Sequence, residues 1–167
     1  MPKGHPSHIS AREAERGPGV RRAGELFVVV VGCGRLGALV ANRLSRSGHH
    51  LTVVDNREEA FAGLSPGYSG FRVEGDATAL ATLREADVEQ ADVVVVATES
   101  DNINLMVGQV AQKLFGVRRV MCRVSEPDRE EVFYELGLDT ICPAMLVGDE
   151  IVESLRRDPA LERSQRS

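Results

Sequence analysis

The sequence predicts a doubly wound, Rossmann-like α/β fold with a six-stranded parallel sheet. Short runs of β-branched residues recur along the chain, with helical patterns between them. Two of these runs, Phe27 to Val31 and Val93 to Val96, are apolar at every position. A strand without alternation has both faces covered, as in a parallel sheet between two layers of helices. Right-handed crossovers then favour the strand order 3-2-1-4-5-6.

Six runs are expected to be the strands. They are Leu26 to Val31, Leu51 to Asp55, Phe71 to Glu74, Val93 to Ala97, Arg119 to Val124 and Asp139 to Cys142. The segments between them have helical spacing and are expected to lay an apolar stripe on the sheet. The positions that carry these stripes are Leu36, Leu39, Val40, Arg43 and Leu44 after the first strand, and Leu105, Val110 and Leu114 after the fourth.

The domain is expected to cover residues 26–157. Residues 1–25 contain Pro, Gly, Ser, His and Arg but lack the continuous apolar stretch of a secretory signal, so we expect a disordered N-terminal arm. The charged residues 158–167 are expected to form a flexible tail, with the last helix fraying before it.

The composition indicates which binding partners and which cellular compartment to expect. The formal net charge of -5 argues against binding to nucleic acid. The longest purely apolar run, Leu26 to Val31, is far short of the ~20 residues that span a bilayer, so we expect no direct membrane insertion. Cys33, Cys122 and Cys142 have neither metal-ligand nor redox spacing. We therefore expect free thiols in a reducing, cytoplasmic compartment.

The strongest chemical motif is Gly32-Cys33-Gly34-Arg35-Leu36-Gly37, a G-x-G-x-x-G between the first strand and the first helix. Gly32 permits a tight turn, Gly34 lets a pyrophosphate approach the backbone, and Gly37 lets helix and strand pack closely. Unpaired N–H groups and the helix dipole favour a phosphate at such a helix start, typically by about 0.3–1 kcal/mol per contact. The alternative is that the glycines serve only the turn.

Two charged residues extend this motif. Asp55 ends the second expected strand about 20 residues past the turn, where a carboxylate can accept hydrogen bonds from ribose hydroxyls. It disfavours a 2'-phosphate, which makes NADP the least expected dinucleotide, although Arg57 weakens that exclusion. Asp55 could instead cap a helix. Arg35 can reach the phosphates of its own ligand or of one in a neighbouring subunit, or be a solvated surface residue.

Two further polar loops are expected at the same edge of the sheet, beyond the carboxyl ends of the third and fourth strands. The first is Gly75 to Thr78, in which Asp76 can accept from an adenine amino group or, with Thr78, cap the next helix. The second is Thr98 to Asn104. Its Thr98, Asp101 and Asn104 are candidates either for the site or for capping the fourth helix.

These stretches together resemble the nucleotide-binding lobe of the RCK (regulator of potassium conductance) family. That lobe, of the TrkA-N type, occurs in the cytosolic subunits of Trk and Ktr potassium uptake systems. The resemblance covers roughly Leu26 to Leu155. Its motifs are V-V-G-C-G-R-L-G at Val30 to Gly37, V-V-D at Val53 to Asp55, G-D-A-T at Gly75 to Thr78, A-T-E-S-D-N-I-N at Ala97 to Asn104, and C-R-V-S-E-P-D at Cys122 to Asp128.

The resemblance implies a binding set for the AMP moiety that NAD(H) and ATP/ADP share. It places adenosine on Gly32, Gly34, Arg35, Gly37, Asp55, Asp76 and Ala77, and Glu126 near the terminal phosphates or their metal. With the neighbouring residues, the candidate site consists of Gly32, Cys33, Gly34, Arg35, Leu36, Gly37, Asp55, Asn56, Asp76, Ala77, Thr98 and Glu126. Glu126 could alternatively be a first-turn acid that favours the following helix. The motifs do not choose between NAD(H) and ATP/ADP.

The resemblance also implies a role. It is that of a regulatory subunit whose homodimer or ring gates a membrane potassium channel or transporter subunit, which would hold it at the inner face of the membrane. The sequence ends soon after the helix expected near Met145, so we expect the smaller second lobe of fuller family members to be absent. The lobe would then work beside a separately encoded partner or only sense nucleotide.

No catalytic constellation is apparent, so we expect no enzyme. His5 and His8 lie in the N-terminal arm, and His49 and His50 are expected between the first helix and the second strand. Tyr68, Tyr134 and Lys113 lack the Tyr–Lys spacing of a short-chain dehydrogenase. The alternative function is a small NAD-dependent oxidoreductase or an NAD(H) redox sensor.

Overall fold

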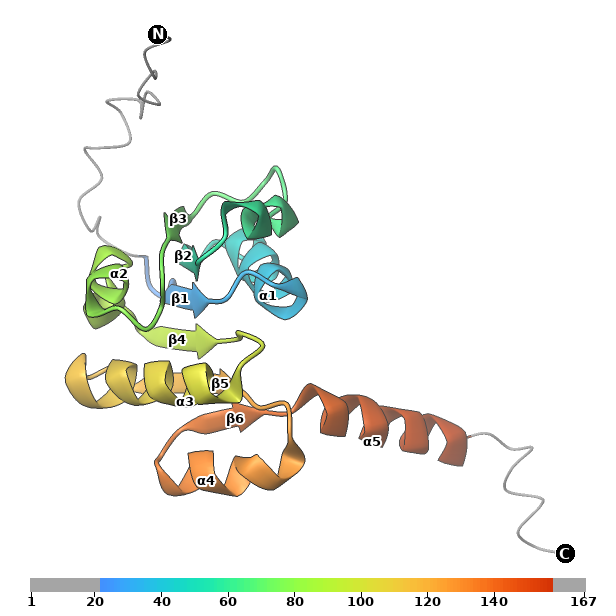
Figure 1. The fold of residues 1–167 in the computed structure, drawn as a ribbon. Helices are drawn as coiled ribbons and strands as arrows, with labels where there is room; N and C mark the ends of the chain where they lie inside the picture. The colour runs from blue at the N-terminus through green and yellow to red at the C-terminus, as the bar shows by residue number, and fades with distance from the viewer. Residues whose placement is uncertain (1–21, 158–167) are drawn as a thin grey trace, which may run out of the picture.

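Six parallel strands form one sheet in the order β3-β2-β1-β4-β5-β6 (Figure 1), and this confirms the predicted order. The strands are β1 (Phe27–Val31), β2 (His50–Asp55), β3 (Phe71–Glu74), β4 (Val93–Val96), β5 (Arg119–Arg123) and β6 (Asp139–Ile141). The computed structural model describes residues 22–157. The expected N-terminal arm falls mostly, and the expected tail wholly, outside this range.

The strand ends differ from the predicted ones by single residues. β2 begins at His50 rather than Leu51, because the His50 N–H donates to the Leu26 carbonyl at 2.9 Å. Beyond the ends of β4 and β5, the Ala97 N–H still donates to the Val31 carbonyl and the Val124 N–H to the Ile141 carbonyl. The parallel ladder therefore carries each chain to the same edge of the sheet, where the loops begin.

Helices cover both faces of the sheet (Figure 1). They are α1 (Arg35–Arg46), η1 (Glu58–Gly63), α2 (Leu80–Glu85), η2 (Val88–Gln90), α3 (Asp101–Gln109), η3 (Val110–Leu114), η4 (Pro127–Arg129), α4 (Glu130–Glu135) and α5 (Pro143–Arg156). The crossover from β2 to β3 contains only the 3-10 helix η1, and α3 ends in the single π-turn η3. None of the helices within residues 22–157 is both long and apolar enough to cross a membrane.

β1 supplies side chains to two separate cores, as its unbroken apolar run predicts. Val28 and Val30 belong to the core under α1 and η1. Val29 and Val31 belong to the larger core on the other face, which also contains Leu83 of α2, Val107 of α3 and Phe133 of α4. Because successive strand residues point to opposite faces, a central strand with two covered faces is apolar at every position.

The predicted apolar stripe on α1 is only partly correct, because Val40 and Leu44 pack against the core but remain partly exposed. Leu39 is 47% exposed, and the buried positions are instead Gly37, Ala38, Ala41 and Ser45. After β4, Leu105 and Val110 likewise pack against the main core. Leu114 is 57% exposed, whereas Val107, Gly108 and Ala111 are buried. Both helices approach the sheet through small residues, which a periodicity of large apolar side chains cannot reveal.

α5 leaves the domain at the carboxyl end of β6 and projects away from the sheet (Figure 1). None of its residues is buried. Its exposed large apolar side chains are Met145, Leu146, Val147, Ile151, Val152 and Leu155. No segment within residues 22–157 covers this apolar surface of α5. Apolar surface of this kind is typical of an interface with another protein.

The close contact between α1 and the end of β1 depends on the absence of a side chain at Gly37. A Cβ on Gly37 would collide with the Gly32 carbonyl, whereas a Cβ on Gly34 would meet nothing within 4 Å. Gly37→Ala should therefore lower the free energy of unfolding by about 3 kcal/mol, because α1 must move off the strand. Gly34→Ala, the matched control, should lower it by no more than about 1 kcal/mol, because only the N-cap preference for glycine is lost. Urea unfolding of the two variants measures both values, and equal stabilities would contradict the contact.

Candidate functional site

The glycine turn gives each of its three glycines a different constraint. Gly32 has a φ of +97°, and a Cβ there would lie 2.9 Å from the Ala97 carbonyl and the Thr98 nitrogen. Gly34 is the N-cap of α1 and borders open space. Gly37 faces the Gly32 carbonyl. The turn can therefore pass close to the β4 loop and still leave its outer surface free of side-chain atoms at Gly34.

Two N–H groups of the turn are already used inside the protein. The Gly32 N–H donates to the Val54 carbonyl at 2.7 Å, and the Cys33 N–H donates to the Asp55 carboxylate at 2.8 Å. No side chain caps the start of α1, and no acidic residue lies in its first turn. The N–H groups of Arg35, Leu36 and Gly37 are therefore the ones that point out of the helix start without an intrahelical acceptor.

Asp55 joins the turn to the neighbouring strand. One carboxylate oxygen accepts from Cys33, and the other accepts from the Arg57 N–H at 3.0 Å and lies 3.7 Å from the Arg57 guanidinium. The Asp55 side chain is only 9% exposed. The residue after Arg57 begins η1, and no side chain caps that helix, so Asp55 is not a helix cap. An ionised carboxylate can accept further hydrogen bonds besides these two.

The loop after β3 is attached directly to Asp55, because the Gly75 N–H donates to the Asp55 carbonyl at 2.9 Å. In this loop the Asp76 carboxylate accepts from the Thr78 N–H at 2.8 Å and from the Thr78 hydroxyl at 2.7 Å. These hydrogen bonds hold the pKa of Asp76 below its ordinary value. Asp76 stays exposed and does not cap α2, whose N-cap is Ala79.

The capping roles considered for the β4 loop are wrong. The residue that caps α3 is Ser100, whose hydroxyl accepts from the Ile103 N–H. Thr98 is bound instead to Asn104: its N–H and its hydroxyl both donate to the Asn104 side-chain oxygen, at 3.1 and 2.6 Å. The Thr98 hydroxyl proton is thus committed within the protein. Thr98 shapes the loop rather than offering a free donor.

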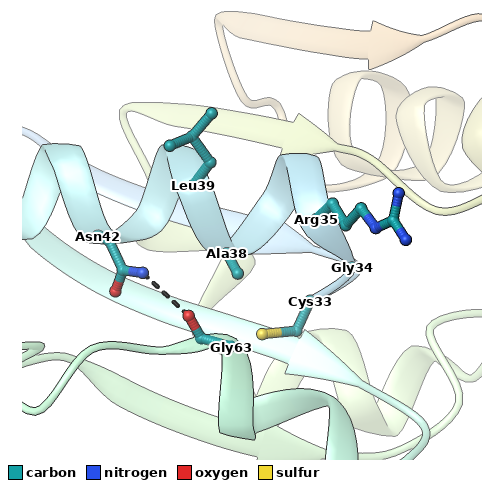
Figure 2. Close-up of a pocket in the computed structure, with 7 residues that line it drawn as sticks. All are labelled: Cys33, Gly34, Arg35, Ala38, Leu39, Asn42 and Gly63. Atoms are coloured by element: carbon teal, nitrogen blue, oxygen red, sulfur yellow. Dashed lines mark hydrogen bonds between the residues drawn. The ribbon is translucent and has the colours of Figure 1, made fainter.

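The remaining candidates lie at this edge of the sheet, and all but the partly buried Ala77 are exposed. Asn56 follows Asp55, Ala77 follows Asp76, and Glu126 lies in the loop after β5 at the N-cap position of η4 without making a capping hydrogen bond. Arg35 is exposed at the start of α1. Figure 2 shows its side chain leaving the turn in a different direction from the Cys33 thiol.

Contacts link the loops into one continuous edge. Gly32 touches the β4 loop, Cys33 binds Asp55, and Asp55 binds Gly75. The structure therefore brings the predicted residues after β1, β2, β3 and β4 into contact through these bonds. Glu126 lies beside Ser125, whose N–H donates to Asp101 of α3. The sequence had suggested Asp101 and Asn104 either as site residues or as caps of this helix.

A pocket of about 430 Å³ lies beside the turn, between α1 and the end of η1 (Figure 2). Its lining residues are Cys33, Gly34, Arg35, Ala38, Leu39, Asn42 and Gly63. Asn42 closes one side by donating to the Gly63 carbonyl at 3.0 Å. Asp55, Asp76 and Glu126 do not line this pocket, so it meets the candidate site only at the glycine turn.

The Cys33 side chain serves packing rather than reactivity. It is buried in the core under α1 and η1. Burial, with a smaller effect of the nearby Asp55, raises the pKa of the thiol to about 11. A thiol of this kind stays protonated near neutral pH and is a poor nucleophile. Within residues 22–157, no cluster of three or more His, Cys, Asp or Glu side chains is arranged to hold a metal ion.

The strand order, the glycine turn at the start of α1 and the acidic residue at the end of β2 together define a Rossmann-like domain. The family model described as the TrkA-N domain matches residues 28–143. The chain belongs to the TrkA-N domain family.

Two curated relatives are Trk system potassium uptake proteins. TrkA of Streptomyces coelicolor is 34% identical over 142 residues, which is 80% of this chain and 64% of that protein. The TrkA homolog of Methanothermobacter thermautotrophicus is 34% identical over 116 residues, or 70% of this chain and 53% of that protein. The chain thus spans between about half and two thirds of the length of these relatives.

Among solved structures, the GsuK RCK domain has a TM-score of 0.66 to this chain and is 27% identical. The match covers 82% of this chain and 29% of that one. GsuK has also been solved bound to ADP and, as the whole channel, bound to NAD. Both of these structures are 26% identical to this chain, with a TM-score of 0.65.

Asp55 supports the fold as well as the candidate site, and this can be measured. Asp55→Ala removes the acceptor of the Cys33 and Arg57 N–H groups, so the free energy of unfolding should fall by about 2 kcal/mol. Asp76→Ala is the control, because Asp76 is exposed and its removal should leave the stability close to that of the wild type. Urea unfolding compares the two, and an unchanged stability of Asp55→Ala would show that the turn does not depend on it.

Proposed function

We propose that this chain is a nucleotide-binding regulatory subunit of a membrane potassium channel or transporter. Its ligand would be NAD(H) or ATP/ADP, bound through the AMP moiety that both contain. The observation that carries the proposal is the uncapped start of α1, with a bare Gly34, held beside Asp55 by the bond from Cys33. This arrangement suits a phosphate next to a ribose.

Each part of the ligand then has a partner on the carboxyl edge. A phosphate would accept from the free N–H groups at the start of α1, and the ribose hydroxyls would donate to Asp55. The adenine would lie over the Gly75 to Thr78 loop, where Asp76 is exposed and ionised down to low pH. Arg35 would reach phosphates beyond the first one. The domain itself would then span residues 26–157.

The relatives support the role and the choice of ligands. The matched curated proteins are named as Trk system potassium uptake proteins, and GsuK is a channel whose solved structures contain ADP or NAD. Because the match covers only part of each relative, the membrane partner of this chain is inferred from their names. Such a partner would keep the chain in the cytoplasm, at the inner face of the membrane.

We further propose that the chain works as a homodimer or a larger ring through α5. The apolar residues of this helix, among them Ile151 and Leu155, are exposed in the single chain. A second copy offers the same apolar helix, and pairing the two would remove this surface from water. Ligand binding would then shift the balance between two arrangements of the assembly, to the extent that it binds one more tightly.

We propose that the chain is not an enzyme. The two described histidines lie at the amino edge of the sheet, opposite the candidate site: His49 accepts from the Leu26 N–H, and His50 lies 3.3 Å from Glu25. No described residue near the glycine turn has the pairing of acid and base that hydride transfer to a second substrate would need.

Identifying the ligand is the first test. The purified protein should release NAD(H), AMP, ADP or ATP on denaturation, detected by mass spectrometry. In calorimetry, Arg35→Ala should weaken ATP binding about tenfold, the loss of one charge-assisted hydrogen bond, and leave adenosine binding unchanged. Arg43→Ala, an exposed arginine at the other end of α1, should change neither. Absence of affinity for all four nucleotides would refute the proposal, and equal losses for ATP and adenosine would remove the role of Arg35.

The proposed assembly is tested by light scattering during size-exclusion chromatography. Ile151→Asp places a charge in the apolar surface of α5, so it should shift the protein to the monomer while nucleotide affinity stays unchanged. Asp149→Asn alters an exposed polar residue of the same helix and should leave the assembly intact. A wild-type protein that is already monomeric would contradict the dimer.

A further inference from the structure

Two polar side chains are buried at the start of α3, on the face that packs against the sheet. Asn104 is completely buried, and the Asp101 side chain is 4% exposed. Their spacing of three residues continues to Val107, which belongs to the main core. Buried polar groups are costly unless they are fully hydrogen-bonded, so their partners show what they hold in place.

Asn104 ties the end of β4 to β5. Its side-chain oxygen accepts from the N–H and the hydroxyl of Thr98. Its side-chain nitrogen donates to the Thr98 carbonyl at 3.0 Å and to the Arg123 carbonyl at 2.8 Å. The Arg123 guanidinium also donates to the Thr98 carbonyl at 2.9 Å. One amide thus fixes the second residue after β4 against the last residue of β5.

Asp101 ties the start of α3 to the loop after β5. Both of its carboxylate oxygens accept from the Ser125 N–H, at 2.9 and 3.1 Å. The Arg129 guanidinium lies 3.9 Å from Asp101 and donates to the Asn102 side chain at 2.7 Å. The loop that carries Glu126 is therefore held from both sides, at Ser125 and at Arg129.

From these contacts we infer that Asp101 and Asn104 are positioning residues for the part of the ligand that extends beyond AMP. The inference rests on the proposed nucleotide-binding function. The groups proposed for adenosine and the first phosphate lie at the carboxyl ends of β1, β2 and β3, whereas Asp101 and Asn104 fix the loops after β4 and β5. Those loops carry the exposed Glu99 and Glu126 at the other half of the same edge. A ligand that crosses the edge from AMP outward meets them next.

The prediction separates positioning from simple support of the fold. Calorimetry on the full chain would compare AMP, ATP and NAD. Asp101→Ala leaves the Ser125 N–H without its acceptor, so ATP and NAD should bind about tenfold more weakly while AMP changes less than about twofold. Asp101→Asn keeps an oxygen for Ser125 and should restore most of the affinity. Asp92→Ala removes an acceptor from the Phe27 N–H at the opposite edge of the sheet and should leave the ratio of the three affinities unchanged.

The calorimetry distinguishes failure of the inference from failure of the proposed function. A parallel loss for AMP, ATP and NAD in Asp101→Ala would show a structural role only and overturn the inference. The same holds if wild-type protein binds AMP as tightly as the longer ligands. Wild-type protein that binds none of the three refutes the proposed function itself.

A measurement on wild-type protein applies even if Asp101→Ala does not fold. NMR hydrogen exchange at the Thr98 and Ser125 amides reports the opening of these two bonds. ATP or NAD should slow exchange at both amides by at least about fivefold more than AMP does. Equal protection by all three ligands would overturn the inference.

Discussion

The structure depends on how closely the backbone of α1 approaches the end of β1. Because Gly37 has no side chain, the helix rests against the Gly32 carbonyl, and because Gly32 adopts a positive φ, the turn passes directly beside Ala97 and Thr98. This approach directs the start of α1 along the carboxyl edge of the sheet and leaves its first N–H groups without internal acceptors. The positions of Asp55 and of the β4 loop follow from it.

The two halves of this edge are organised by different means. On the side of β1 to β3, backbone groups do most of the work: Cys33 and Gly75 both bind Asp55, one through its carboxylate and the other through its carbonyl. On the side of β4 and β5, buried side chains hold the loops in place. Asn104 donates to the Thr98 carbonyl, and Asp101 accepts from the Ser125 N–H. The first half needs glycine to let chains meet, whereas the second needs polar groups in the core to hold separated loops together.

The sequence predicted the strand order and the geometry of the glycine turn, because both follow from local patterns: runs of valine, the periods between them and glycines at fixed offsets. It predicted only part of how α1 and α3 pack, because Val40 and Leu105 contact the core as expected. Small residues such as Ala38, Ala41 and Gly108 carry little hydrophobic signal, while the larger Leu39 and Leu114 proved to be exposed. It also suggested Asp101 and Asn104 as caps, since a polar residue at a helix start fits that role until its partner across the sheet is known. Ser125 and Arg123 are such partners, and they come about 20 residues later in the chain.

α5 has a mechanical consequence. Only Cys142 separates it from β6, and its 14 helical residues, which begin at Pro143, span about 21 Å. A rigid arm of that length amplifies motion at its base: a tilt of about 10° there displaces the far tip by roughly 4 Å. Small movements of the loops after β5 and β6 would therefore become larger displacements at the C-terminal end of α5.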